Sequence, residues 1–273
     1  MRIATWNLKQ AVAPKKDLQT LWTWASEEIQ PDVIVFTEAK VPKDYESYGW
    51  TAQWNPEGIH PEKKQRWGTV IASSSVDLVP VTHVKRGLRQ IPLEFHWPAA
   101  VQISDIMVEG ERWATIVGMY APGWDLRGNK TGHGHDSLNY LLDQLRPLID
   151  SSRGDRLLIA GDFNLWPVDV QRYFRNLDFV DLIEHTAPNR APLPQCANCD
   201  FLAENGRKHV NRCGHLWTHR NGNSPNAKRQ QIDYIYSSPA LAEELIGLKG
   251  GVADFPDAWD VSDHAPVVAD FHT

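Results

Sequence analysis

Hydrophobic and polar residues alternate along this 273-residue chain with the periods of both helices and strands. Apolar residues recur at helical spacing over residues 18–29 and 138–149, which predicts two amphipathic helices. Residues 101–108 and 112–120 alternate as strands, which predicts an antiparallel hairpin turning at residues 109–110. Short apolar runs predict further strands at residues 3–8, 33–37, 68–72, 156–163, 232–237 and 266–271. This mixture indicates layers of sheets and helices.

Several of the predicted strands stop abruptly at an acid, an amide or a histidine. An apolar run of this length is typical of a buried strand, so the polar residue at its end lies on the rim of the sheet. The residues in question are Asn7, Glu38, Asp162 and Asn164, together with His264 at the head of the last predicted strand. Gathered at one rim, they would form a cluster of carboxylates, amides and an imidazole. Such a cluster is the outline of a metal-assisted hydrolase site.

Five motifs follow one another along the chain: Trp6-Asn7, the strand-terminal Glu38, Gly161-Asp162-Phe163-Asn164, Ile232-Asp233-Tyr234 and Ser262-Asp263-His264. In this order they resemble the endonuclease/exonuclease/phosphatase superfamily, which has the DNase I-like fold, and its exonuclease III/AP endonuclease branch in particular. The motifs reach from Asn7 to His264, so the resemblance covers nearly the whole chain. It implies an α+β four-layer sandwich, in which two mostly antiparallel sheets pack face to face and are flanked by helices.

Three residues of these motifs are the expected ligands of a divalent metal. A hard ion such as Mg²⁺ or Mn²⁺ prefers carboxylate and amide oxygens and would neutralise the oxygens of a phosphate ester. Glu38 is the first candidate, because a charged group that ends a buried strand needs a partner; an exposed strand cap is the alternative. The resemblance implies that Asp263 is a second carboxylate near the metal. Asn7 would either complete the ligand shell or hydrogen-bond the phosphate.

The resemblance also implies catalytic roles. Asp162 and Asn164 are one residue apart, so on an extended chain their side chains point the same way. Asp162 is expected to orient or deprotonate the attacking water and Asn164 to contact the phosphate; an ordinary Asp-Asn turn is the alternative. Asp233 is expected to pair with His264 and to favour a charged imidazole that meets the phosphate. Tyr120 occupies the position of a phosphate-contacting tyrosine, with a core or rim aromatic as an equal alternative.

The three cysteines form a second candidate metal site. Their spacing, together with a following histidine, suits a tetrahedral Zn²⁺ ion. The candidate ligands are Cys196, Cys199, Cys213 and His215, with His209 as the alternative fourth ligand. A structural zinc would order a polar stretch that has little periodicity. Three reduced cysteines in a long loop are the alternative.

A single domain over residues 1–273 is expected, with a Cys/His-containing insertion at about 185–230, because cutting the chain would divide the motifs. No apolar stretch approaches the roughly 20 residues that span a membrane, and the N-terminus does not resemble a signal peptide. With three cysteines and no export signal, a reduced, cytoplasmic protein is expected. No protein partner is indicated.

The chain carries a net charge of -6, but its basic residues cluster in three predicted loops. One cluster holds Lys63, Lys64 and Arg66, a second holds Lys85, Arg86 and Arg89, and the third holds the candidate substrate contacts Arg207, Lys208, Arg212 and Arg220. Solvated loops would explain any one of them. Three such clusters in an acidic chain favour a polyanionic substrate.

We therefore expect a Mg²⁺- or Mn²⁺-dependent phosphodiesterase that acts on nucleic acid. Specificity for abasic sites is disfavoured, because Gln230 occupies a position where AP endonucleases can place an aromatic residue. The alternative is a phosphatase or phosphodiesterase that uses the same site on a small or lipid phosphoester. A nucleic-acid-binding module without catalysis is a third hypothesis, but binding alone needs none of the catalytic carboxylates.

Overall fold

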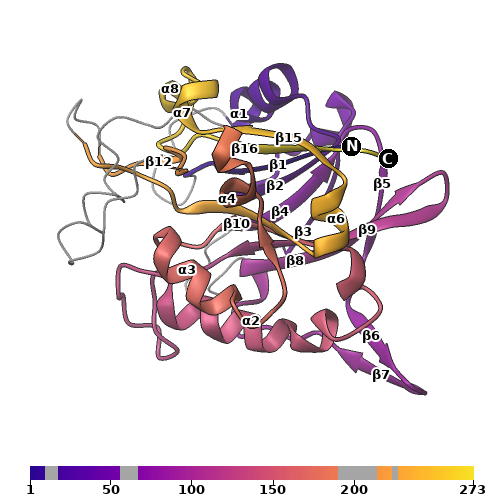
Figure 1. Ribbon diagram of the computed structural model, residues 1–273. Helices are drawn as coiled ribbons and strands as arrows, with labels where there is room; N and C mark the ends of the chain where they lie inside the picture. The colour runs from indigo at the N-terminus through magenta and orange to yellow at the C-terminus, as the bar shows by residue number, and fades with distance from the viewer. Residues whose placement is uncertain (10–17, 56–66, 190–213, 223–226) are drawn as a thin grey trace.

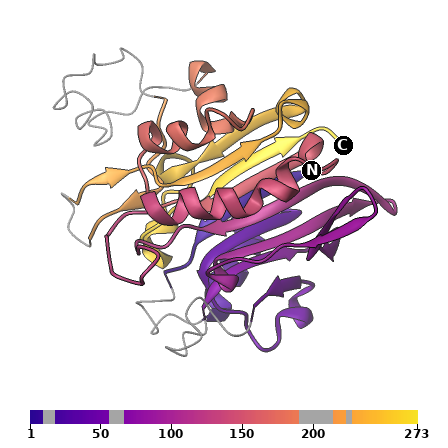
Figure 2. The ribbon, with the colours of Figure 1, turned by 90° about the horizontal axis from the view of Figure 1, so that it is seen from below.

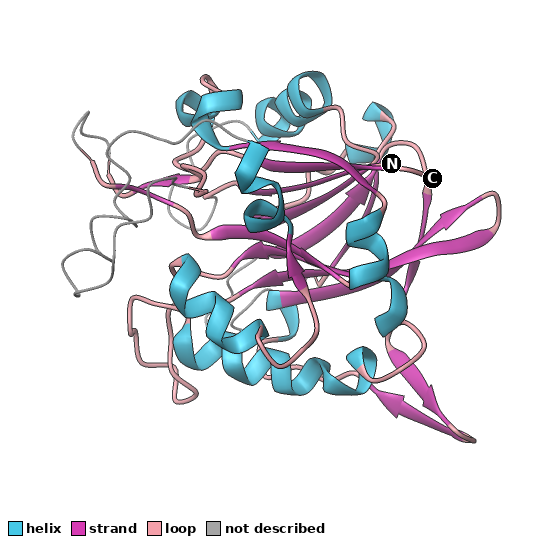
Figure 3. Cartoon of the chain, in the orientation of Figure 1, coloured by secondary structure: helices cyan, strands magenta, loops and turns pink. Residues whose placement is uncertain are grey.

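The computed structural model describes residues 1–9, 18–55, 67–189, 214–222 and 227–273. Within these parts of the chain, two six-stranded sheets lie in the middle of the molecule and helices cover their outer faces (Figures 1 and 3). The expected α+β sandwich of two packed sheets flanked by helices is confirmed. None of the helices in the described ranges has both the length and the apolar character needed to cross a lipid bilayer.

The first sheet combines strands from both ends of the chain. In spatial order it contains β15 (Leu245–Gly250), β16 (Val267–Phe271), β1 (Arg2–Asn7), β2 (Val33–Ala39), β4 (Gly68–Ser73) and β3 (Thr51–Trp54). The pair β1 and β2 is parallel, and the other pairs in this sheet are antiparallel. The two chain ends therefore lie side by side (Figure 1), and the Met1 amino group donates to the carbonyl oxygen of Phe271 at 2.8 Å.

The second sheet has the same mixture of directions. Its spatial order is β11 (Val180–Asp181), β14 (Asp233–Ser237), β10 (Leu157–Asp162), β9 (Glu111–Tyr120), β8 (Val101–Val108) and β5 (Asp77–Pro80). The pair β9 and β10 is parallel and the others are antiparallel. The predicted hairpin is β8–β9, and both of its turn residues, Glu109 and Gly110, have positive φ, as a tight two-residue turn requires.

Two short ribbons stand outside these sheets. The strands β6 (His83–Arg86) and β7 (Arg89–Pro92) pair with each other and project from the body of the protein (Figure 1). The strands β12 (His219–Arg220) and β13 (Arg229–Gln230) pair within the predicted insertion. The insertion therefore contains regular structure that its sequence pattern did not indicate.

The central strands of the first sheet are buried on both faces. Ile3 and Val35 face the core between the sheets, whereas the alternate residues Trp6 and Phe36 belong to a separate cluster on the outer face, with α1 (Leu18–Trp24). This double burial explains why these strands are continuous apolar runs rather than alternating ones. The polar residue that ends each apolar run therefore lies where the buried strand ends, at the rim of the sheet.

Helices close both outer faces of the sandwich. The second sheet is covered by α2 (His135–Ile149) and α3 (Pro167–Phe174), as Figures 1 and 2 show. The first sheet is covered by α1, which continues as a π-helical turn over Ala25–Ile29, and by α7 (Gly251–Asp254) and α8 (Ala258–Val261). The short helices α4 (Leu182–Thr186) and α6 (Pro239–Glu243) flank β14. Both helices expected from the sequence are present.

Gly161 allows β10 to approach β9 closely just before the rim. Its φ is +151°, and a Cβ atom added there would lie 1.8 Å from the backbone oxygen of Met119. A backbone atom of a paired strand cannot move aside as a flexible side chain can. A larger residue would therefore push apart the two parallel strands that carry Tyr120 and Asp162.

We expect Gly161→Ala to lower the free energy of unfolding by about 1–3 kcal/mol or more, because the added methyl group overpacks the β9–β10 pair. Thermal unfolding followed by circular dichroism measures this loss. Gly247→Ala in β15 is the matched control, because a Cβ atom added there meets no atom within 4 Å. Equal unfolding midpoints for the two variants would contradict the close approach.

Candidate active site

Strand direction brings the polar strand ends to one rim of the sandwich. The parallel strands β1 and β2 carry Asn7 and Glu38 to this rim from the first sheet. The parallel strands β9 and β10 carry Tyr120 and Asp162 to it from the second sheet, where these two residues are register partners. Strand β14 runs antiparallel to β10 and starts at the same rim, so Asp233 pairs with Asp162.

His264 is fixed in this cluster by its backbone and by its ring. It precedes β16, which begins beside the end of β1. Its ring atom Nδ1 lies 2.9 Å from Oδ2 of Asp233, and both side chains are buried. The indole N–H of Trp6 donates to its carbonyl oxygen at 2.9 Å, and its own N–H donates to the Ser262 hydroxyl at 3.2 Å. The Asp233 contact places a proton on Nδ1 and leaves Nε2 for another partner.

The surrounding carboxylates keep His264 positively charged. Burial lowers the pKa of His264, but the charge and hydrogen bond of Asp233 outweigh it. The charges of Asp162 and Asp263 add to this effect, and together they raise the pKa of His264 to about 10. At neutral pH the site therefore presents a buried imidazolium, which is suited to meeting the negative charge of a phosphate.

Asp162 is the carboxylate best placed to take up a proton. Its Oδ2 accepts a hydrogen bond from the side-chain amide of Asn7 at 2.8 Å, and its Oδ1 accepts one from the backbone N–H of Asn164 at 2.8 Å. Burial raises the pKa of Asp162 well above its ordinary value, and the negative charge of Asp233 raises it further. A carboxylate with a raised pKa binds a proton more readily, as a general base does.

The expected geometry of Asp162 and Asn164 is wrong, although both residues lie at the rim. The strand ends at Asp162, and Asn164 has a φ of +49°, so the chain turns here instead of remaining extended. The Asn164 side-chain amide donates to the carbonyl oxygen of Ala121 at 3.1 Å. Asn164 lies near Asp162 because the backbone N–H of Asn164 donates to the Asp162 carboxylate. The two side chains do not share a face of an extended strand.

Glu38 and Tyr120 form a direct link between the sheets. The Tyr120 hydroxyl donates to Oε1 of Glu38 at 2.9 Å, and the Tyr120 ring packs edge-on against Trp67 with centroids 5.6 Å apart. Glu38 has a φ of +45° and lies where the pairing of β2 with β4 shifts register, which turns its side chain toward the rim. Burial raises the pKa of Glu38 despite the nearby His264 charge.

Asp263 lies in a more positive environment than the other acids. Lys9 forms an ion pair with its Oδ2, and Nε2 of His219 lies 3.7 Å from the same oxygen. Burial raises the pKa of Asp263, but His219, the charge of His264 and Lys9 together outweigh it and lower that pKa. Asp263 therefore stays ionised more readily than Asp162 or Glu38, whose pKa values are raised.

His219 is a member of the cluster that the sequence did not reveal. It belongs to β12, forms an isolated β-bridge with His264, and its ring centroid lies 4.4 Å from that of His264. Burial and the neighbouring His264 charge lower the pKa of His219, which favours a neutral ring. Its surrounding sequence has no periodicity, and only the bridge to His264, far along the chain, brings it to the site.

The cluster fits a divalent metal by its donor atoms. Ligand atoms of Asp162, Asp233 and His264 lie within 4.8 Å of one another, and so do those of His219, Asp263 and His264. Because His264 is charged and bonded to Asp233, the donors available to a metal are carboxylate oxygens and not this imidazole. Oδ1 of Asp233 and Oδ1 of Asp263 are buried and lack a hydrogen-bond partner among the described residues. Buried carboxylate oxygens without a donor are costly unless a cation approaches them. Their chemistry suits a hard ion, in agreement with the expectation from the motifs.

Asn7 has a contact that neither of its expected roles included. Its side-chain nitrogen donates to Asp162, while its Oδ1 accepts the backbone N–H of Lys9 at 2.8 Å. It therefore positions Asp162 across the gap between the two sheets. Its predicted roles as a metal ligand or phosphate contact stay predictions.

Most of the predicted insertion chemistry lies outside the described residues. This applies to the zinc candidates Cys196, Cys199, Cys213 and His209 and to the basic residues Arg207, Lys208 and Arg212. Arg220 is described: its guanidinium donates to the carbonyl oxygen of Trp259 and lies 5.4 Å from the centre of that ring. His215 is also described, in the stretch that precedes β12.

A cavity borders the cluster of Asp162, Asp233 and His264 at the rim. It has a volume of about 270 Å³ and is lined by Asn164, His133, His135 and Gln230, among others. His135 accepts or donates a hydrogen bond at 3.0 Å with the Tyr173 hydroxyl, and its ring lies 4.8 Å from that of His133. The two loop histidines thus border the site, and Gln230 adds an amide to the lining of the same cavity.

Comparisons with known proteins agree with this geometry. The model of the Endonuclease/Exonuclease/phosphatase family matches residues 4–264. An AP endonuclease from Archaeoglobus fulgidus has 19% sequence identity and a TM-score of 0.65, with 100% of both chains covered. The 3′-5′ exonuclease NExo from Neisseria meningitidis has 20% identity and a TM-score of 0.61, again with 100% of both chains covered. These likenesses confirm the DNase I-like fold, and no curated protein matches the sequence.

We expect Asp233→Asn to lower the pKa of His264 from about 10, because it removes the charge that opposes the effect of burial most strongly, and only the weaker effects of Asp162 and Asp263 remain. Titration of the imidazole by NMR measures this change. His264 has a higher pKa when folded, so its charge stabilises the fold at low pH and this contribution is lost as the pH rises through about 10. Asp178→Asn, on the surface, should leave the titration unchanged. An unaltered His264 pKa in Asp233→Asn would contradict the pairing.

Proposed function

Because the chain belongs to the endonuclease/exonuclease/phosphatase family, we propose that it is a divalent-metal-dependent nuclease that hydrolyses phosphodiester bonds of nucleic acid. Members of this family hydrolyse phosphoesters, and so does this enzyme. The observation that carries the proposal is the buried Asp233–His264 pair, set beside Asp162 at the rim shared by both sheets. These residues combine a charged imidazolium, His264, that faces the phosphate with a carboxylate, Asp162, that accepts a proton from the attacking water.

We assign the roles as follows. A Mg²⁺ or Mn²⁺ ion, held by Glu38 and Asp263 with the Asn7 amide oxygen, would supply positive charge for the phosphoryl oxygens when bound. Asp162 accepts the proton of the attacking water, because its pKa is raised. His264, charged and held by Asp233, directs Nε2 to the phosphate. The Asn164 amide and the Tyr120 hydroxyl are further donors at the rim.

A nucleic-acid substrate is supported by the solved structures that share the fold. One of them, a 3′ phosphatase NExo from Neisseria at 19% identity and a TM-score of 0.61, over 100% of both chains, is bound to a product DNA hairpin. The amide of Gln230 in the neighbouring cavity argues against abasic-site specificity. A small or lipid phosphoester is the competing substrate class.

We also propose that residues 1–273 act as one domain, because the site takes residues from both sheets and from both ends of the chain. The basic residues Arg207, Lys208, Arg212 and Arg220 remain the proposed substrate contacts of the insertion. We place the protein in the cytoplasm, where cysteines stay reduced and available to a metal.

We expect His264→Ala and Asp162→Asn each to reduce nuclease activity by about 10²–10⁴-fold, because each removes a group that acts on the phosphate or the water. The measurement is cleavage of single- and double-stranded DNA, RNA and an abasic duplex with Mg²⁺ or Mn²⁺, with and without EDTA. His185→Ala, an exposed histidine on α4, is the matched control. Turnover of small phosphoesters with no cleavage of any polynucleotide would move the enzyme to the competing substrate class.

We expect protein purified without chelator to contain one zinc ion per chain, held by Cys196, Cys199, Cys213 and His215. Elemental analysis by mass spectrometry measures it. Cys196→Ser with Cys199→Ser should lose the zinc, whereas His209→Ala should retain it unless His209 is the fourth ligand. Absence of zinc from the parent protein would exclude the structural site without affecting the catalytic one.

A further inference from the structure

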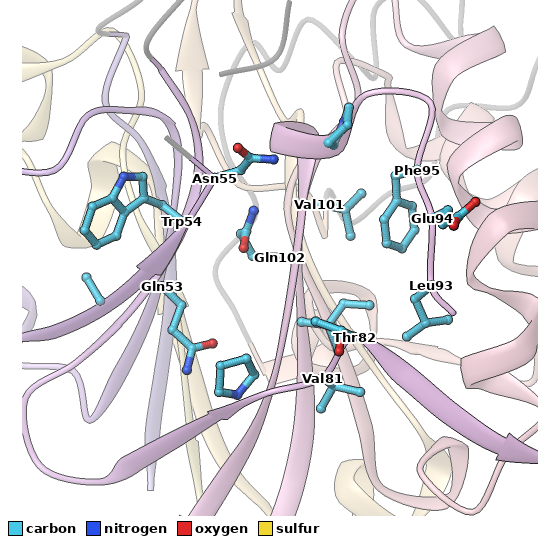
Figure 4. Close-up of a pocket in the computed structure, with 14 residues that line it drawn as sticks. Gln53, Trp54, Asn55, Val81, Thr82, Leu93, Glu94, Phe95, Val101 and Gln102 are labelled. Carbon is cyan, nitrogen blue, oxygen red and sulfur yellow. The ribbon is translucent and has the colours of Figure 1, made fainter. Parts of the chain in front are cut away.

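A cavity of about 790 Å³ lies on the open edge of the sandwich, and no candidate catalytic residue lines it (Figure 4). Residues of β3, from the first sheet, and of β8, from the second, form two of its sides. Its volume is in the range of cavities that bind small molecules and cofactors. It is therefore large enough to hold more than a water cluster.

The cavity exists because the neighbouring strand covers only part of β8. Strand β5 pairs with β8 from Ser104 to Met107, and the Val81 N–H extends this by one bond, to Ile103. The chain then departs into the β6–β7 ribbon, so no strand of the described residues pairs with Val101 and Gln102 on this side. The uncovered end of β8 is also the end nearer the rim, since Val101 pairs with Met119, the residue before Tyr120.

The lining combines an aromatic wall with a free amide. Figure 4 shows Gln102 and Asn55 on one side of the cavity and Phe95 and Leu93 on the other. Gln53 is held in place, because its amide donates to the carbonyl oxygen of Leu78 at 2.9 Å and accepts from the Ser104 hydroxyl. The side-chain amide of Gln102, in contrast, has no hydrogen-bond partner among the described residues. An aromatic ring and an amide that face one cavity from opposite sides offer the stacking and hydrogen-bonding groups that recognise an unpaired nucleobase.

Charge determines which part of a nucleotide suits this cavity. Glu94 is an acidic member of the lining and disfavours a phosphate inside. The lining residues Thr82 and Leu93 flank the β6–β7 ribbon, which carries the exposed residues Lys85, Arg86 and Arg89. These three cations form no salt bridge with another described residue. A nucleotide therefore fits best with its uncharged base inside the cavity, near Glu94, and its phosphates near the three cations of the β6–β7 ribbon.

The cavity is connected to the candidate active site by a short turn. Pro98 lines the cavity, and the turn Pro98–Ala100 packs on β4, where the Thr69 hydroxyl donates to the carbonyl oxygen of Ala100 at 2.8 Å. Gly68 leaves no room for a side chain against Ala99. Trp67, the preceding residue, packs on Tyr120, which contacts Glu38. The turn and Trp67 are thus the packed residues that lie between the cavity and the candidate active site.

We propose that this cavity binds one or two unpaired nucleotides of the substrate strand, with a base between Phe95 and Gln102 and the following phosphates on Lys85, Arg86 and Arg89. This inference rests on the proposed nuclease function and adds a preference for a single-stranded end or overhang. The cavity is thus a specificity site on the flank of the sandwich, separate from the catalytic cluster.

The test is equilibrium binding by fluorescence anisotropy in EDTA, which prevents cleavage. The probes are a blunt DNA duplex and the same duplex with a single-stranded 5′ or 3′ overhang. The parent should bind one overhang duplex about tenfold more tightly than the blunt one, which corresponds to about 1.4 kcal/mol. Phe95→Ala with Gln102→Ala should remove this preference and leave blunt-duplex affinity unchanged. Gln102→Glu keeps the side-chain size and should weaken overhang binding by adding negative charge.

The ribbon is tested separately. Lys85→Ala with Arg86→Ala and Arg89→Ala should weaken overhang binding and reduce its salt dependence, because fewer phosphate contacts release fewer counterions. Arg146→Ala, an exposed arginine on α2, is the matched control and should change neither. All variants are compared with the parent by thermal unfolding, so that loss of fold is recognised.

Equal affinity of the parent for blunt and overhang duplexes would overturn the inference, as would a preference that survives in the folded Phe95→Ala, Gln102→Ala protein. Cleavage of nucleic acid by that parent would still leave the proposed function standing. A parent that neither binds nor cleaves any nucleic acid would instead overturn the proposed function itself.

Discussion

The hydrogen bond between Asp233 and His264 joins the two sheets at the rim, and the arrangement of the site depends on it. Asp233 begins β14 in the second sheet, whereas His264 leads into β16 in the first. Both side chains are buried, so each charge needs the other. Removing one partner from such a pair leaves an uncompensated buried charge, which typically costs about 3–5 kcal/mol. The same hydrogen bond therefore positions the imidazole of the site and holds the two sheets together at the rim.

Two further contacts cross between the sheets at this rim. Asn7 of β1 donates to Asp162 of β10, and Tyr120 of β9 donates to Glu38 of β2. Because these donors and acceptors come from strands buried on both faces, their positions are fixed by the core and not by surface loops. A rigid, partly desolvated cluster of this kind can face a phosphate with little reorganisation. Two of its carboxylate oxygens, on Asp233 and Asp263, are buried without a hydrogen-bond partner among the described residues. The proposed metal would bring positive charge close to them.

The sequence predicted those features that depend on local periodicity. Continuous apolar runs marked the buried strands, and the polar residue ending each run lay at the rim because β1, β2, β9 and β10 all end there. Other features depend on contacts between distant segments. His219 reaches the site through a bridge to His264, the left-handed turn at Asn164 breaks the expected extended geometry, and the flank cavity depends on where β5 stops pairing with β8. No local pattern specifies these three features.

The central claim is that Asp233 acts on the substrate through His264. A double-mutant cycle on kcat/KM for polynucleotide cleavage tests it most directly, using Asp233→Asn, His264→Ala and the combined variant. We predict strong non-additivity: Asp233→Asn should lower kcat/KM substantially in the parent and have little further effect in the His264→Ala background. Equal losses in the two backgrounds would show that Asp233 acts independently of His264 and would contradict this account.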